Sequence, residues 1–235
     1  TLIHQNNMGT FTGPNIIDDG LVFAVDAGSD RSYPGSGTTT TNIINSVDGT
    51  LTNGVAYVTN NGGAFDFDGT DDFIVFPDDT NLNNQNLTIE TWVNLDGTVD
   101  QSAFLFEKGN VNTQYSNFFD GSGNFYFRTK GLSSEDLTVD SSTYVTAGVW
   151  CHCVTTIASG VKKIYFDGVN VATTGSLTGT IPVTTAGLFI GAYAQSGTGV
   201  SYFINGKIAV LRVYSQGLTA AEVLQNYNAQ KSRFI

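Results

Sequence analysis

Hydrophobic and polar residues alternate along much of this chain, and the alternation predicts β-strands with one buried face. Phe65 and Phe67 alternate with aspartates, and a second strand-like run, 73–76, follows an acidic turn that contains glycine. Residues 87–95 alternate over their whole length. Further strands are predicted at 21–25, 104–106, 124–128, 150–157, 163–166, 169–172, 188–191 and 207–214.

Turn and cap signals separate these strands and predict one helix. Asp167-Gly168 stands between two strands, and both residues tolerate the positive φ of a two-residue hairpin. Near the end of the chain, Thr219 and Glu222 have the spacing of a capping box. The pattern predicts a helix over 220–230 with a single apolar stripe.

No segment between the strands resembles a crossover helix, so the sheets are predicted to be antiparallel. The fold class we expect is all-β: an antiparallel two-sheet jelly-roll sandwich with one short C-terminal helix. Residues 1–19 are predicted to be an N-terminal arm that docks onto a partner, and 20–235 the sandwich. Residues 38–54, rich in Thr, Asn and Gly, are predicted to be a loop with little structure.

Composition narrows the classes of function. The net charge of −11 argues against nucleic-acid binding, which needs clustered Lys and Arg, and its simplest consequence is solubility. No apolar run has membrane-spanning length, and the opening residues do not have a signal-peptide pattern. Cys151 and Cys153 lie two apart in a predicted strand, where a disulfide would be strained. Free thiols favour assembly in a reducing cytoplasm.

Several segments, in order, resemble the laminin G-like branch of the concanavalin A-like lectin/glucanase sandwich. The resemblance covers most of the chain from about Gly20 onward and implies the same two-sheet fold. The segments are 64–73, 87–93, 148–154, 164–168, 190–191, 206–214 and 217–222.

Both ends of the predicted sandwich carry a narrower resemblance. Residues 20–28, 32–39 and 223–234 are similar to laminin G-like structural proteins of tailed, marine (cyanophage-type) bacteriophages. This likeness implies a virion protein exposed on the particle surface as a head decoration, a fibre or a tail-associated protein. Its implied location is the virion, assembled in the host cytoplasm. The implied partners are other virion proteins, in a homo-oligomeric or multi-copy assembly.

Acidic residues suggest calcium, but the family pattern is incomplete. The laminin G-like pattern has an acidic residue where this chain has Ala209, and the partner loop is reduced to residues 45–49. Calcium is therefore disfavoured, because affinity falls with ligand count and charge, and no cofactor is predicted. Asp68, Asp71 and Asp72 are interpreted as carboxylates that cap their own turn. Asp78 and Asp79 are interpreted as a solvated turn.

No catalytic residues are predicted, and the chain is expected not to be an enzyme. Glycosidases of this fold pair carboxylates along a strand, commonly as Glu-x-Asp-x-x-Glu, and that pattern is absent. Glu90 stands alone on its strand, and Glu135-Asp136 lies in a serine-rich loop. His152 is interpreted as a packed or hydrogen-bonded core residue, without a partner for a triad.

Exposed tyrosines are the remaining candidates for binding. Tyr115, Tyr126, Tyr193 and Tyr202 could stack on sugar rings, although such tyrosines also serve as ordinary sheet-surface residues. Tyr193 and Tyr202 are the candidates for a glycan site, because they flank the 195–199 loop. The leading hypothesis is a non-enzymatic virion protein that also adheres to host surface polysaccharide. The alternatives are a carbohydrate-binding adhesin outside a virion and a glycan hydrolase of the same superfold.

Overall fold

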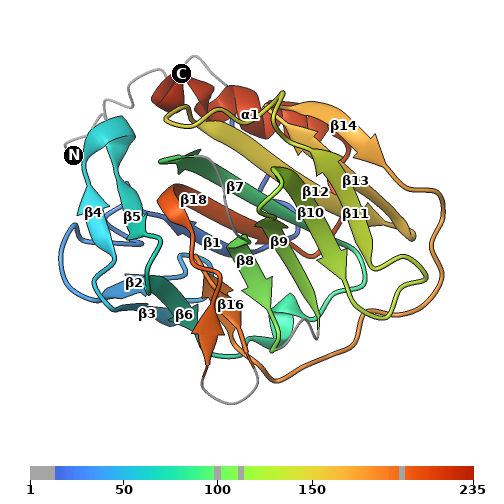
Figure 1. The fold of residues 1–235 in the computed structure, drawn as a ribbon, viewed down its shortest axis with the longest axis horizontal. Helices are drawn as coiled ribbons and strands as arrows, with labels where there is room; N and C mark the ends of the chain where they lie inside the picture. The colour runs from blue at the N-terminus through green and yellow to red at the C-terminus, as the bar shows by residue number, and fades with distance from the viewer. Residues whose placement is uncertain (1–13, 98–101, 111–113, 196–198) are drawn as a thin grey trace, which may run out of the picture.

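The computed structural model describes residues 14–97, 102–110, 114–195 and 199–235, and it has the predicted two-sheet sandwich (Figure 1). The first sheet, here the helix-side sheet, has β7 and β18 at its centre. Its order is β14 (Val169–Thr173), β13 (Val161–Phe166), β12 (Cys151–Ala158), β7 (Leu87–Leu95), β18 (Asn205–Tyr214), β5 (Ala64–Asp68) and β4 (Ala56–Val58), with β1 (Leu21–Asp26) also pairing with β18.

The second sheet, here the open sheet, lies opposite and is also antiparallel. Its order is β11 (Asp136–Asp140), β10 (Asn124–Thr129), β9 (Tyr115–Phe119), β8 (Ala103–Lys108), β15 (Leu188–Ile190), β6 (Phe73–Phe76), β3 (Asp48–Thr52) and β2 (Thr39–Thr41). A separate ribbon pairs β16 (Tyr193–Ala194) with β17 (Val200–Ser201), and two short 3₁₀ helices are η1 (Asn60–Gly62) and η2 (Thr80–Leu82).

The main core lies between the two sheets. Alternate residues of β7, such as Ile89 and Val93, point into it, as the sequence pattern predicted. Cys151 and Cys153 are buried in the same core as free thiols, with their Sγ atoms 3.7 Å apart. The predicted hairpin is confirmed, because Asp167 and Gly168 have φ of 49° and 80° between β13 and β14.

Helix α1 (Ala220–Phe234) covers the outer face of the helix-side sheet, which explains why β7 is buried on both faces. It begins with the predicted capping box, in which Thr219 accepts from the Glu222 backbone and Glu222 accepts from Thr219. The helix ends at Phe234, four residues beyond the predicted end, because Phe234 packs onto Trp92 at a ring-centroid distance of 4.3 Å. None of the helices in the described part of the chain is long and apolar enough to cross a membrane.

The described part of the predicted arm, residues 14–19, packs on the domain. Ile17 N donates to Asn226 Oδ1 at 2.8 Å, and Tyr214 Oη donates to Ile17 O at 3.1 Å. Residues 1–13 lie outside the described residues, so docking of the arm onto a partner stays a prediction.

The prediction that 38–54 is a loop is wrong, because this segment contains β2 and β3. Leu51 and Thr40 are buried, and β3 pairs along β6. Such polar strands are held in place by backbone hydrogen bonds to the neighbouring strand and by the burial of every second residue. Strands β4, β9, β11, β16 and β17 were also absent from the sequence prediction.

Candidate functional site

The two sheets differ in how their outer faces are covered. Helix α1 lies on the helix-side sheet, whereas the β16–β17 ribbon lies against β8 on the open sheet (Figure 1). The outer face of β8, β9 and β10 beside this ribbon carries aromatic and charged side chains around a hollow of about 380 Å³. We call it the aromatic hollow, and its lining residues are Ser102, Phe104, Phe118, Asp120, Tyr126, Arg128, Tyr193, Gln195 and Tyr202.

A row of three rings forms the floor of the aromatic hollow. Phe104, Phe118 and Tyr126 are cross-strand partners on β8, β9 and β10, so they share one face of the sheet. The Phe104 and Phe118 rings stack at 4.4 Å, and those of Phe118 and Tyr126 at 4.7 Å, with interplanar angles of 9° and 7°. Because the three rings stack face to face, they cover one another's faces and restrict one another's movement.

The two tyrosines that the sequence singled out lie together at one end of this row. Tyr193 packs on Phe104 at 4.8 Å, and Tyr202 lies 5.7 Å from Tyr193. Tyr202 keeps 45% of its surface exposed and has a φ of 55°, a left-handed conformation uncommon for a bulky residue. Its carbonyl accepts from Phe104 N, which fixes this backbone to β8. The binding of a glycan by these tyrosines stays a prediction.

Polar groups at the other end of the row are held by hydrogen bonds. Asp120 accepts from the Tyr126 hydroxyl at 3.0 Å and from the backbone N–H of Ser122 and Asn124 at 2.9 Å. Burial alone would raise the pKa of Asp120, but hydrogen bonds from the Asn124 side chain and these neighbours hold it below its ordinary value. Asp120 is therefore an ionised hydrogen-bond acceptor at neutral pH.

Arg128 brings a positive charge to the hollow, and this charge is already paired. Its Nε and Nη2 donate to the two carboxylate oxygens of Asp136 at 2.7 and 2.8 Å. The guanidinium lies 4.9 Å from the centroid of the Phe118 ring. Hydrogen bonds to Asp136 raise the pKa of Arg128 above its ordinary value.

The sequence reasoning found only part of this site. Tyr115, offered as an exposed aromatic, is buried instead, and its hydroxyl donates to Leu82 O, because it points into the core beside Phe106. Phe104, Phe118 and Asp120 were not proposed as site residues. Alternation on 124–128 indicated the face, but the register across three strands decides which rings align.

A second cluster of polar residues is buried between α1 and the helix-side sheet. The Glu90 carboxylate accepts from Arg212 Nη1 and Asn226 Nδ2, both at 2.8 Å, and it lies 3.0 Å from His152 Nε2 and 3.2 Å from Tyr214 Oη. We call this the Glu90 network. Its members come from β7, β12, β18 and α1, so it ties the helix to the sheet.

The Glu90 network is structural. Burial alone would raise the pKa of Glu90, but Arg212, His152 and Asn226 lower it to about 2. The carboxylate is therefore locked as an anion, and both Glu90 and His152 are fully buried. The interpretation of His152 as a packed, hydrogen-bonded residue is confirmed, since it also packs on Trp92 at 4.9 Å.

Acidic residues surround another hollow, of about 400 Å³, at the end of β5. Asp68, Asp71 and Asp72 have carboxylate oxygens within 4.8 Å of one another and could hold a cation. The predicted turn hydrogen bonds are present, since Asp68 accepts from Thr70 N and Asp72 accepts from Asp68 N. Burial is the largest cause that raises the pKa of Asp72, and the charges of the neighbouring aspartates raise it further. The hydrogen bond from Asp68 N–H acts in the opposite direction and lowers this pKa. The prediction against calcium stays a prediction.

The interpretation of Asp78 and Asp79 as a solvated turn is wrong in part. Asp78 accepts from the buried Lys108 Nζ at 2.8 Å. Asp79 caps η2 through Asn81 N. A buried ammonium needs such a partner, which is why this turn is held against the sheet.

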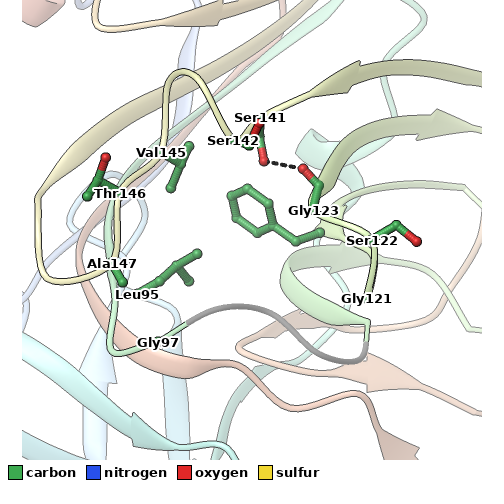
Figure 2. Close-up of a pocket in the computed structure, with 11 residues that line it drawn as sticks. Leu95, Gly97, Gly121, Ser122, Gly123, Ser141, Ser142, Val145, Thr146 and Ala147 are labelled. Carbon is green, nitrogen blue, oxygen red and sulfur yellow. Dashed lines mark hydrogen bonds between the residues drawn. The ribbon is translucent and has the colours of Figure 1, made fainter.

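A cavity at the rim of the sandwich, of about 570 Å³, opens between the ends of β7 and β9 (Figure 2). Leu95, Val145 and Phe119 give it an apolar lining, and Ser141 Oγ donates to Gly123 O at 2.6 Å beside it. None of its described lining residues is charged. It therefore lacks the charged hydrogen-bonding groups that Asp120 and Arg128 bring to the aromatic hollow.

The family profile described as the concanavalin A-like lectin/glucanases superfamily matches residues 68–224. The chain belongs to this superfamily. This is the superfamily that the sequence segments resembled. The match also agrees with the two-sheet sandwich of the structure. No curated protein matches the chain in sequence.

Solved structures similar to this member of the superfamily include carbohydrate enzymes and a toxin. Domain 4 of AbnA, a GH43 extracellular arabinanase from Geobacillus stearothermophilus solved with arabinotriose, is 16% identical with a TM-score of 0.65, over 88% of this chain and 98% of that one. Trypanosoma rangeli sialidase in complex with sialic acid is 17% identical with a TM-score of 0.67, over 92% of this chain. The binding domain of Paraclostridial Mosquitocidal Protein 1 is 14% identical with a TM-score of 0.67, over 89% of this chain and 52% of that one.

At these identities the likeness shows the lectin/glucanase fold alone. The chain spans about a third of the sialidase, 34% of its length. None of these three structures is a phage protein, so the narrower resemblance to virion proteins stays a prediction.

Proposed function

We propose that this chain is a non-enzymatic carbohydrate-binding module and that a glycan binds in the aromatic hollow. The observation that carries the proposal is the placement of Tyr193 and Tyr202 over Phe104, within reach of the polar groups of Asp120 and Arg128. A sugar ring has an apolar C–H face and a rim of hydroxyl groups. Aromatic rings with a few oriented polar groups match both parts.

The size and rigidity of the hollow support the proposal. Its volume of about 380 Å³ falls at the small end of the range for small-molecule sites. The floor is fixed by stacked rings and Asp120 by four hydrogen-bond donors, so little ordering is needed on binding. The left-handed backbone of Tyr202 keeps a large aromatic residue exposed at the rim.

The acids near the hollow favour binding over hydrolysis. Most glycosidases use two carboxyl groups across the scissile bond, and Asp120 is the only carboxylate among the described lining residues. Asp120 has a lowered pKa, the reverse of what a general acid needs. Glu90 is sealed beneath α1, on the other sheet.

Replacing Tyr202 with alanine should weaken glycan binding by about tenfold or more, because an exposed aromatic anchor is lost. Tyr144→Ala is the matched control, since Tyr144 is exposed to a similar extent, 41% against 45%, and does not line the hollow. An array of bacterial and plant oligosaccharides identifies ligands, and calorimetric titration then compares the two variants. Equal affinities for both variants, or no ligand on the array, would reject this site.

We further propose, from the resemblance of residues 20–28 and 223–234 to phage proteins, that the module is exposed on a virion as a decoration, fibre or tail-associated protein. Its partners would then be other virion proteins, reached through the N-terminal arm, and the polysaccharide of the host surface. Mass spectrometry of purified virions of the source phage tests this proposal. Absence of the chain from the particle would leave an adhesin outside a virion.

A further inference from the structure

The charges around the aromatic hollow are unequal, and the inequality bears on which sugars enter it. Arg128 is the only cationic residue among the described residues that line the hollow, and Asp136 balances its charge, whereas the acidic lining residue Asp120 has no cationic partner among the described residues. We infer that the hollow takes neutral sugars and rejects those carrying a carboxylate, such as sialic and uronic acids. This inference rests on the proposed function.

The charge of Arg128 is already balanced by an anionic partner. Two of its nitrogens already donate to Asp136 in the bidentate arrangement that a sugar carboxylate would need. The side chains of both residues are partly buried, with 23% and 34% exposure, and the bidentate geometry keeps the pair together. An acidic sugar that used the same two nitrogens would have to displace Asp136 and leave its charge beside the ligand.

Asp120 presents an anion to the hollow. Its carboxylate is ionised at neutral pH, and its oxygens accept from the backbone N–H groups of Ser122 and Asn124 and from the Tyr126 hydroxyl. Such a group repels a second carboxylate. No described cation pairs with Asp120.

Glu107 adds a further acidic group beneath the ribbon. It is fully buried on β8, and its Oε2 accepts from Ala194 N at 2.6 Å. Burial raises the pKa of Tyr193, and the charge of Glu107 is the next cause, which places this carboxylate close to the tyrosine ring. Asp120 therefore lines the hollow, Asp136 pairs with Arg128 beside it, and Glu107 lies close to Tyr193, so three acidic residues lie at or near the hollow against one guanidinium.

Neutral hydroxyl groups find complementary partners at the same rim. Four residues whose side chains carry a hydroxyl or amide group line the hollow together with Asp120: Ser102, Tyr193, Gln195 and Tyr202. Gln195 Nε2 donates to Ser201 Oγ at 2.9 Å, which orients its carbonyl oxygen as an acceptor. These groups can donate to and accept from a diol without adding charge.

Matched pairs of probes test the inference: lactose against 3′-sialyllactose, and each neutral oligosaccharide bound on the array against its glucuronic acid-capped form. The neutral member should bind at least about tenfold more tightly at low salt, because like charges a few ångströms apart repel strongly in a partly buried site. Raising the salt concentration should reduce the ratio of neutral to acidic affinity. Salt screens the repulsion, so only the acidic probe should bind more tightly.

Asp120→Asn should reduce the ratio of neutral to acidic affinity, whereas Asp140→Asn should leave it unchanged. Asp140 is the matched control because it also accepts from a backbone N–H two residues on, at Ser142, and lies outside the hollow. Equal or tighter binding of the acidic probe, still weakened by Tyr202→Ala, would overturn the inference and leave the proposed function standing. Binding of neither member of any pair would overturn both.

Discussion

Replacing Glu90 by glutamine should lower the free energy of unfolding by about 3–5 kcal/mol at pH 7, the range for breaking a buried ion pair. The variant leaves the Arg212 guanidinium buried without its anion, and His152 and Asn226 lose an acceptor. Because these groups join β7, β12 and β18 to α1, the loss loosens the helix from the sheet. Urea unfolding followed by circular dichroism measures the difference.

The effect of Glu90 should also depend on pH. The folded-state pKa of about 2 lies below the ordinary value of 4.5, so ionised Glu90 stabilises the fold above pH 4.5. That stabilisation, about 3 kcal/mol by linkage, is lost as the pH falls from 4.5 toward 2. The gap between the native protein and Glu90→Gln should therefore narrow over this interval.

Glu135→Gln is the matched control, because Glu135 forms an ion pair with Lys130 at a site where both side chains are partly exposed. Its loss should cost less than about 1 kcal/mol. A Glu90→Gln variant as stable as the control at pH 7, or a gap that does not change in acid, would contradict the role given to the Glu90 network.

Trp92→Ala should cost about 3–5 kcal/mol, the usual range for deleting a buried aromatic side chain. Trp92 is fully buried, and its ring stacks on Phe234 at 4.3 Å and on Tyr227 at 5.9 Å. Both partners belong to α1, so the cavity left by alanine lies under the helix. Urea unfolding gives the stability, and the near-ultraviolet spectrum reports the packing of the remaining rings.

Trp92→Phe is the control for this prediction. It keeps an aromatic ring under α1, and no hydrogen bond is lost because the Trp92 indole N–H has no hydrogen-bond partner among the described residues. We expect it to cost less than about 1.5 kcal/mol. Similar losses for phenylalanine and alanine would mean that stacking on α1 is not what stabilises this layer.

The sequence predicted those features that depend on neighbours along the chain. Alternation over 87–95 predicted the central strand β7, and the capping-box spacing of Thr219 and Glu222 predicted where α1 begins. The loop prediction for 38–54 failed because pairing with β6, rather than local hydrophobicity, makes these residues strands.

The site depended on long-range register. Tyr193 and Tyr202 could be selected from the sequence because they flank one loop. The floor of the aromatic hollow could not, because Phe104, Phe118 and Tyr126 align only through the register of β8, β9 and β10. In the same way Glu90 stood alone on its strand in the sequence, and its partner Arg212 lies 122 residues away. Pairing over such distances is decided by the topology of the sandwich, which local patterns do not report.

The most direct test of the central claim is a crystal structure with a neutral oligosaccharide that binds on the array. We expect a sugar ring against Tyr202 and Tyr193, with its hydroxyl groups beside Asp120. A sugar bound instead in the rim cavity beside Leu95 and Val145, or among the aspartates at the end of β5, would contradict the account.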